Sequence, residues 1–430
     1  MSIREEHSPA AAPREGKPEG RGKRPGSAVA AVFALGAAAA FLLCGYEFIR
    51  SVSTSLFIDA YTADRLPVVM AVMPLGVLLT LYVYGVILSR LGPARALMAT
   101  SGLSAGLIAA CYAGLLAGWK PATGVLYIFR EAYIVLIIEQ YWSLINSVLS
   151  PEQAKRFNGP ITGIGSLGSI AGGLLLKRFA VDVGTETFLL YAAASLLPAA
   201  LCSWLAYTWA GEPQPSPEEA GGRQGHLALG IFARSRYLLL LAALIALTQF
   251  LSTALDLRFS TLVEAVYPVK DERTEFYGGF YALLNGSAAA LQFLVAPLLL
   301  RAAPLRAVHA GIPLVHLAAA FVLLLHPTLA AGGAAYILFK ALDYSLFRAG
   351  KEILYIPLSF DVRYRAKEVI DAFVYRFAKG GLGLGVTVAG GVLGKISGGT
   401  YPGIAMLCAL LWLPIVLALT RQADRKEATG

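Results

Sequence analysis

The sequence predicts an all-α polytopic membrane protein with about twelve transmembrane helices in two six-helix halves. Hydrophobic residues make up 57% of the 430 positions and charged residues only 15%. The mean hydropathy of +0.63 lies well outside the range of soluble domains. Apolar runs of about eighteen residues or more recur along the chain, each long enough to cross a bilayer as a helix. A transmembrane β-barrel is excluded because its strands would alternate apolar and polar residues.

Composition divides the chain into five segments. A basic tail at 1–27, rich in Pro and Gly, is expected to be disordered. A polar linker at 211–236 separates the six-helix halves at 28–210 and 237–420, and a short cytoplasmic tail follows at 421–430. The expected spans are 29–58, 66–88, 96–117, 122–149, a Gly-rich fifth, a sixth ending near Trp209, 237–266, an eighth, 305–325, a tenth and eleventh joined within 340–379, and 402–420.

The basic residues of the loops favour one side of the membrane. With the N-terminus inside, the cytoplasmic loops collect Arg90/Arg95, Lys155/Arg156, Arg301/Arg306 and Arg363/Arg365/Lys367, whereas the other side has few cations. Positive charge is retained on the cytoplasmic side, so both termini are expected there. The net charge of +9 is then explained by these loops, and no nucleic acid partner is expected. The paired loops Lys155/Arg156 and Arg363/Arg365/Lys367 are either solvated or form pairs between the halves.

Cysteines and glycines indicate packing rather than chemistry. The four cysteines lie inside apolar spans without close spacing, so neither a disulfide framework nor a metal site is expected. The fifth span contains Gly159, Gly163, Gly165, Gly168, Gly172 and Gly173. Small residues at this density let helices approach closely in lipid. A phosphate-binding loop is the rival interpretation, but no strand precedes these glycines and no Gly-Lys-Ser/Thr sequence ends them.

Charged residues inside the apolar spans are the candidate substrate-binding residues. A charge in a lipid-spanning helix costs several kcal/mol unless it faces a partner or a water-filled cavity. The candidates are Glu47, Arg50, Arg130, Glu131, Asp256, Arg258, Lys340, Arg348, Lys351 and Glu352. Most fall on the first and fourth helices of each half, which suggests two repeated halves with a substrate site at their interface, as in the major facilitator fold. We expect these side chains to converge on one central cavity.

The stretch 340–379 carries the densest group of intramembrane charges. Helical spacing predicts that Lys340, Tyr344, Arg348, Lys351 and Tyr355 share one face before the break at Pro357. This largely cationic stripe would line a transport cavity. The alternative is a purely structural ion-pair network, formed by Lys340 with Asp343 or by Arg348 with Glu352.

Several motifs resemble the ATP:ADP antiporter family of plastids and energy-parasitic bacteria. They are Glu152-Gln-Ala-Lys155-Arg156-Phe157 before the Gly-rich helix, Ser345-Leu-Phe347, Lys351-Glu352-x-x-Tyr355-Ile356-Pro357-Leu358, Lys367-x-x-Ile370-Asp371 and Lys379-Gly-Gly381. The resemblance spans both halves and implies nucleotide antiport on a major-facilitator-like fold. It also implies that family acids important for transport correspond to Glu131 and Asp256.

The chain departs from the family pattern at three places. Ser53 stands where a first-helix lysine is expected, with Arg50 one turn earlier, and Ser260 stands where a seventh-helix lysine is expected. Arg348-Ala349 replaces Asp-Pro before the Lys351 motif. All three changes affect charged positions, mainly cationic ones, and leave the apolar pattern of the helices intact. The predicted fold is therefore unchanged, and recognition of phosphate is the property in which this chain is expected to differ from the family.

The leading hypothesis is a secondary transporter that moves an organic anion, such as a nucleotide or another phosphorylated metabolite, by alternating access. Arg is suited to bidentate contacts with phosphate or carboxylate, and Lys to point-charge contacts. The alternative is proton-coupled transport of a lipid-like or drug-like amphiphile through Glu47 or Asp256. A membrane-embedded enzyme is disfavoured because the spans contain neither a histidine cluster with metal-ligand spacing nor a serine–histidine pairing. A non-transporting scaffold or receptor would not explain why so many charged residues lie inside the apolar spans. The expected protein is a monomer in the bacterial inner membrane, surrounded by lipid, without a cofactor.

Overall fold

The computed structural model describes residues 25–133, 151–210, 235–356 and 366–427, together with the isolated residues 232, 358 and 362. The regular secondary structure of these residues is entirely helical, joined by short turns and loops, and no strand occurs in them. Most of the predicted linker at 211–236, except residues 232, 235 and 236, and the loop cations Arg363 and Arg365 lie outside the described residues.

The helices before the linker are α1 (Pro25–Tyr61), the short η1 (Ala63–Arg65), α2 (Leu66–Leu91), α3 (Pro93–Leu116), α4 (Pro121–Tyr133), α6 (Pro151–Val183) and α7 (Thr187–Ala210). Those after it are α10 (Arg236–Val266), α11 (Lys270–Ala290), η3 (Leu291–Val295), α12 (Ala296–Ala302), α13 (Leu305–Leu325), α14 (Leu329–Leu342), η4 (Asp343–Phe347), α15 (Arg348–Tyr355), η5 (Glu368–Val374), α17 (Tyr375–Leu393) and α18 (Thr400–Glu427).

Nine helices among the described residues are long and apolar enough to cross a membrane. Three predicted spans are not among these nine: the fourth, which extends beyond the described residues, and the charged tenth and eleventh. The tenth is nevertheless a continuous helical run from Leu329 to Tyr355, formed by α14, η4 and α15. The protein is therefore a multi-pass integral membrane protein whose most charged helices are its least lipid-like.

Local sequence explains several helix ends. Gly92 ends α2 with a φ of 74°, which favours glycine, and Pro93 then starts α3 at a position where its missing N–H is not needed. The side-chain oxygens of Ser235 and Thr328 accept hydrogen bonds from the backbone N–H groups of Leu238 and Ala331 and so cap α10 and α14.

Two separate apolar cores stabilise the molecule. One consists of residues of α1 to α7, with Leu35, Ile49 and Phe188 among its buried members. The other consists of residues from Phe232 to Leu419, including Phe259 and Trp412. The predicted close packing of the glycine-rich helix is confirmed, because a Cβ on Gly168 of α6 would lie 2.3 Å from the carbonyl oxygen of Ala40 in α1.

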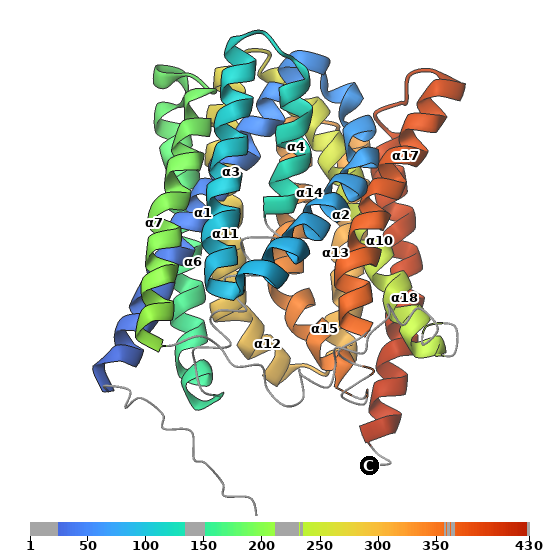
Figure 1. The fold of residues 1–430 in the computed structure, drawn as a ribbon. Helices are drawn as coiled ribbons and strands as arrows, with labels where there is room; N and C mark the ends of the chain where they lie inside the picture. The colour runs from blue at the N-terminus through green and yellow to red at the C-terminus, as the bar shows by residue number, and fades with distance from the viewer. Residues whose placement is uncertain are drawn as a thin grey trace, which may run out of the picture.

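The N-terminal helices α1 to α7 meet the C-terminal helices α10 to α18 mainly through two helix pairs. α6 packs against α11, and α2 packs against α17. In Figure 1, α2 crosses the front of the molecule obliquely towards α17. A third, smaller apolar cluster joins the two groups, with Phe57 and Tyr127 on one side and Leu257 and Tyr401 on the other.

Candidate functional site

A cavity of about 640 Å³ lies between the N-terminal and C-terminal helices. We call it the cationic cavity. Eight charged residues among those described line it. Five are cations (Arg348, Lys351, Lys367, Arg376 and Lys379) and three are acids (Glu131, Asp343 and Glu352). Thr248, Gln249, Tyr344 and Tyr375 add neutral polar groups. The lining therefore carries a formal excess of positive charge in an environment where uncompensated charge is costly.

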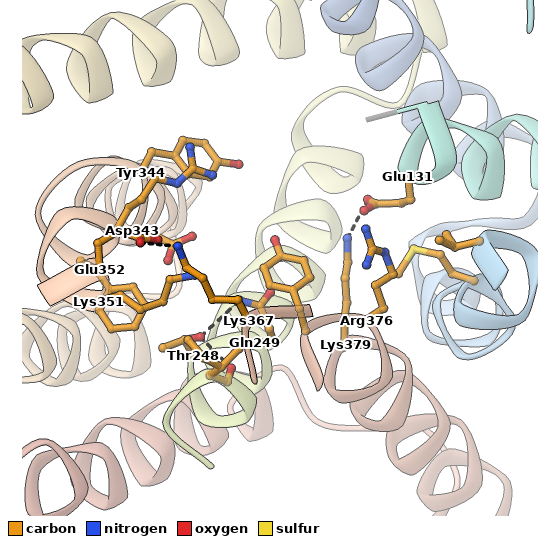
Figure 2. Close-up of a pocket in the computed structure, with 16 residues that line it drawn as sticks. Glu131, Thr248, Gln249, Asp343, Tyr344, Lys351, Glu352, Lys367, Arg376 and Lys379 are labelled. Carbon is orange, nitrogen blue, oxygen red and sulfur yellow. Dashed lines mark hydrogen bonds and ion pairs between the residues drawn. The ribbon is translucent and has the colours of Figure 1, made fainter. Parts of the chain in front are cut away.

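The charges form two groups that face each other across this cavity (Figure 2). On one side Lys379 of α17 donates to Glu131 of α4 at 2.7 Å, and Arg376 lies beside them. On the other side Lys367 forms an ion pair with Glu352, near Lys351 and Asp343. The first ion pair connects the N-terminal helices with the C-terminal helices, whereas the second lies within the C-terminal helices.

The ion pairs expected from a structural network in the tenth span do not form. Neither Lys340 with Asp343 nor Arg348 with Glu352 is among the ion pairs of the described residues, and Glu352 pairs with Lys367 instead. Arg348 is exposed to the cavity. The stripe thus contributes to a cavity lining at Tyr344, Arg348 and Lys351.

A second cavity of about 310 Å³ adjoins the first. We call it the Glu47 cavity, and it shares Tyr344, Arg348 and Tyr375 with the cationic cavity. Its remaining polar lining consists mostly of neutral hydroxyl and amide groups, from Tyr46, Thr162, Ser166, Ser169, Asn285 and Gln292, with the pair Glu47 and Arg50. The two cavities together offer one region dense in charged groups and one in which most polar groups are neutral.

Glu47 links the two groups of helices at this second cavity. The Asn285 amide of α11 donates to Glu47 Oε1 at 2.8 Å, and Arg50 Nη1 lies 3.8 Å from Oε2. Glu47 is only 2% exposed, and its Oε2 has no hydrogen-bond partner among the described residues. The Arg50 guanidinium stacks 3.7 Å from the ring centroid of Tyr281, also on α11.

Arg130 is buried next to this region without lining either cavity. Its Nη1 donates to the carbonyl oxygen of Arg50 at 3.2 Å and to the Thr54 hydroxyl. Its guanidinium also lies 3.7 Å from the ring centroid of Tyr127 and 3.7 Å from Glu131. Arg130 thus joins α4 to α1 and positions Glu131 at the cavity wall.

Lys340 and Asp256 also lie outside the linings of the two cavities. Lys340 is 7% exposed, with Nζ 5.9, 5.5 and 5.6 Å from the ring centroids of Tyr336, Phe339 and Tyr344. Aromatic faces attract a cation at these distances. Asp256 is half-buried on α10.

Arg258 lies further away, towards the loop between α17 and α18. A Cβ built on Gly398 would be 2.4 Å from Arg258 Nη1, so the guanidinium sits directly against that loop. The structure thus places Glu47, Arg50, Glu131, Arg348, Lys351 and Glu352 in cavity walls, Arg130 and Lys340 beside them, and Asp256 and Arg258 outside them.

Some lining residues were not among the sequence candidates. Lys367, Arg376 and Lys379 supply three of the five described cations of the cationic cavity. The spacing of Arg376 and Lys379 by three residues within an apolar span was the available signal. No group of three metal-ligating side chains suitable for a metal ion occurs among the residues described.

Polar contacts between the two groups of helices close the end of the molecule opposite the termini. We call this the closed end. Its contacts join Ala63 N to Glu264 Oε2 at 3.0 Å, Arg273 Nη1 to Ser55 O at 3.0 Å, Thr185 Oγ1 to Asp271 Oδ1 at 2.6 Å, Lys395 to Asp64 at 3.2 Å, and Lys270 to Glu186.

The cationic cavity extends towards the other end. At that end lie the side chains of Glu352 and Lys367, which are 48% and 36% exposed. The side chains of Glu131 and Lys379, the other ion pair of the lining, are only 19% and 14% exposed. In Figure 1, α15 and the C-terminus lie at this same end of the molecule. The described residues therefore form a cavity that is sealed at the closed end and accessible from the side of the termini.

Comparison with protein families confirms the resemblance seen in the motifs. The family model described as TLC ATP/ADP transporter matches residues 309–422. The chain is 24% identical over 347 residues to ADP,ATP carrier protein 1 of Chlamydia pneumoniae, covering 70% of this chain and 66% of the relative. It is 23% identical over 309 residues to ADP,ATP carrier protein 3 of Rickettsia bellii, covering 60% of this chain and 61% of the relative. The chain thus spans somewhat less than two thirds of these relatives' lengths and resembles them as a divergent relative.

Solved structures show the fold. A bacterial homologue of the iron transporter ferroportin in an inward-facing state matches with a TM-score of 0.64 at 13% identity, covering 89% of this chain and 98% of that one. The nucleoside transporter NupG matches with a TM-score of 0.60 at 13% identity, covering 92% and 99%. A D-xylose–proton symporter matches with a TM-score of 0.59 at 16% identity, covering 89% and 96%. The predicted major-facilitator-like fold is confirmed.

Proposed function

We propose that this protein is a secondary active transporter that moves a phosphorylated organic anion, with a nucleotide as the leading substrate, by alternating access. The observation that carries the proposal is the cationic cavity, which lies between the two groups of helices and is sealed at the closed end. A cavity at such an interface can be opened to either side by rocking one group against the other.

The chemistry of the lining supports an anionic substrate. Arg348 offers a planar group for bidentate contact with phosphate oxygens, and Lys351, Lys367 and Lys379 offer point charges. Glu131 and Glu352 hold two of these cations in ion pairs, so part of the positive charge is neutralised until a substrate binds. A lipid-like or drug-like substrate would favour an aromatic and mostly neutral pocket, which this cavity is not.

Similarity to the two curated carriers supports a nucleotide as the substrate, because both are named ADP,ATP carriers. The match of the TLC ATP/ADP transporter model to residues 309–422 covers the helices that supply all five described cations. Exchange of one nucleotide for another is therefore the mode that we propose, without a bound cofactor.

We place both termini in the cytoplasm of a bacterial cell, with the protein in the inner membrane as a monomer surrounded by lipid. The excess of Arg and Lys in the loops on the side of the termini supports this orientation. The cavity then faces the cytoplasm, and the closed end faces outwards.

Exchange in proteoliposomes tests the proposal. Vesicles loaded with ADP should take up labelled ATP, and unlabelled nucleotides should compete while adenosine should compete far less. Arg348→Gln and Lys351→Gln should each lower affinity roughly ten- to hundredfold, the effect of losing one charge-assisted contact of about 1.5–3 kcal/mol. Arg90→Gln, at the exposed end of α2, is the matched control and should leave uptake unchanged.

Folded Arg348→Gln and Lys351→Gln proteins with full exchange activity would contradict anion transport. Uptake of a neutral amphiphile instead of any phosphorylated compound would replace the proposal with the amphiphile hypothesis.

A further inference from the structure

The two adjoining cavities differ in chemistry in a way that matches the two ends of a nucleotide. The cationic cavity has five described cations, whereas the polar groups that line the Glu47 cavity are mostly neutral hydroxyls and amides, with Glu47, Arg50 and the shared Arg348 as its described charges. Their volumes of about 640 and 310 Å³ are typical of small-molecule sites. Arg348, Tyr344 and Tyr375 line both, so a single ligand can occupy the two together.

Glu47 Oε2 is a buried acceptor that lacks a hydrogen-bond donor. Its side chain is 2% exposed, and none of the described residues donates to Oε2, although Asn285 donates to Oε1. Arg50 Nη1 lies 3.8 Å from Oε2, close enough for an ion pair but too far for a hydrogen bond. A buried carboxylate oxygen without a hydrogen bond costs free energy, so nearly all such atoms in proteins have a donor. Because Glu47 lines the cavity, a ligand that enters it can supply the missing donor.

Resting on the proposed function, we propose that the Glu47 cavity binds the nucleoside of the substrate while the cationic cavity binds its phosphates. An amino group on the base donates to Glu47 Oε2. Asn285 donates one of its two amide hydrogens to Glu47 Oε1. It donates the second to the ring nitrogen beside the amino group of the base. Tyr344 and Tyr375, at the junction, flank the ribose and the α-phosphate.

This arrangement makes the site selective for the base. Adenine and cytosine present an amino donor next to a ring-nitrogen acceptor, which complements the acceptor of Glu47 and the donor of Asn285. Uracil presents the reverse pattern, a ring N–H beside a carbonyl oxygen, and would leave Glu47 facing another acceptor. ATP and CTP should therefore bind more tightly than UTP, although all three carry the same triphosphate.

The first experiment uses the wild-type protein and two fragments of ATP. Adenosine and inorganic tripolyphosphate should stabilise the purified transporter against heat independently, so that their thermal shifts add when both are present, because they occupy different cavities. Mutually exclusive binding of the two fragments would overturn the assignment.

The second experiment changes the base end alone. Glu47→Gln should lower the ratio of ATP to UTP affinity about tenfold or more, the effect of exchanging one favourable hydrogen bond for an unfavourable contact. It should leave tripolyphosphate binding unchanged. Asn285→Ala should lower the same ratio and covers the case in which Glu47→Gln does not fold. Lys379→Gln should instead weaken ATP, UTP and tripolyphosphate together.

The outcomes separate this inference from the proposed function. If nucleotides bind but Glu47→Gln and Asn285→Ala weaken ATP and UTP equally, the nucleoside lies elsewhere and the inference fails while nucleotide transport stands. If no nucleotide and no tripolyphosphate stabilises the wild-type protein, the proposed function fails as well.

Discussion

Glu131 of α4 and Lys379 of α17, 248 positions apart in the sequence, form an ion pair at 2.7 Å in the wall of the cationic cavity. Their side chains are 19% and 14% exposed, so water screens the pair only in part. The pair joins the N-terminal helices to the C-terminal helices, and Arg130 and Arg376 lie beside it. An anion that binds Lys379 competes with Glu131 for the same cation.

This competition predicts opposite effects for the two partners. Lys379→Gln removes a cation from the site and should weaken ATP binding roughly ten- to hundredfold. Glu131→Gln frees Lys379 from its competitor, so ATP binding should tighten or stay the same, while exchange slows because product is released less readily. Titration of purified variants with ATP, compared with their exchange rates in vesicles, measures both quantities.

A purely structural ion pair makes a different prediction. Either substitution would then lower the unfolding temperature and the ATP affinity together, and the double variant would recover stability because no charge is left unpaired. Arg178→Gln is a suitable control, since Arg178 forms an exposed ion pair with Asp182 at 3.1 Å away from both cavities.

The closed end should have to open in every transport cycle. Thr185 Oγ1, in the turn between α6 and α7, lies 2.9 Å from Thr274 Oγ1 of α11, and both residues are fully buried. Thr185→Cys with Thr274→Cys, in a protein whose four native cysteines are replaced by alanine, places two sulfur atoms close enough for a disulfide. Oxidation should stop exchange completely, and a reductant should restore it.

The single cysteine variants, treated with the same oxidant, provide the control and should keep their activity. Full exchange by the cross-linked double variant would mean that the closed end does not open, and alternating access would have to be abandoned.

The sequence was sufficient to predict the fold because lipid imposes a simple requirement on composition. A helix that crosses the bilayer must be apolar over about twenty residues, so its presence is visible without knowledge of its neighbours. Close packing at Gly168 was predictable for a similar reason, since only small residues allow helix backbones to touch.

The site was harder to predict because a charged side chain that points into the helix bundle can either line a cavity or be buried against neighbouring side chains. Arg130 and Arg348 both lie within apolar helices, but Arg130 stacks on Tyr127 whereas Arg348 faces the cavity. Lys340 matches the helical period of the cationic stripe, but the π-helical segment η4 follows it and shifts the later residues relative to that period. The role of Lys379 depends on Glu131, a partner that no local pattern indicates.

Arg258 and Arg348 were both predicted from the sequence to bind substrate, but only Arg348 lines a cavity, so comparing them tests whether the cavities are the substrate site. Arg348 lines both cavities, whereas the Arg258 guanidinium lies against Gly398 near the closed end. Arg348→Gln should weaken ATP binding at least tenfold, while Arg258→Gln should leave it within about twofold. Equilibrium titration of the two variants distinguishes them, and equal losses would place Arg258 in the substrate site after all.

The contact between α6 and α11 should tolerate no added side chain, because the two backbones touch there. A Cβ on Gly278 of α11 would lie 2.7 Å from the carbonyl oxygen of Gly173 in α6, and a backbone oxygen cannot move aside as a side-chain end can. Gly286, two turns further along α11, is the matched control, because a Cβ added there would have no atom within 4 Å. Alanine favours an α-helix over glycine by about 1 kcal/mol at both positions, so that gain cancels in the comparison.

Gly278→Ala should therefore lower the unfolding temperature relative to Gly286→Ala, by the amount expected for about 1–3 kcal/mol of overpacking. It should also slow exchange, because α6 and α11 belong to the two groups of helices that must move past each other. Measuring both variants by thermal unfolding and by ATP exchange tests the two effects separately. If Gly278→Ala matched Gly286→Ala in both measurements, α6 and α11 would have to be further apart than the structure places them, and this helix pair could not be the surface on which the halves rock.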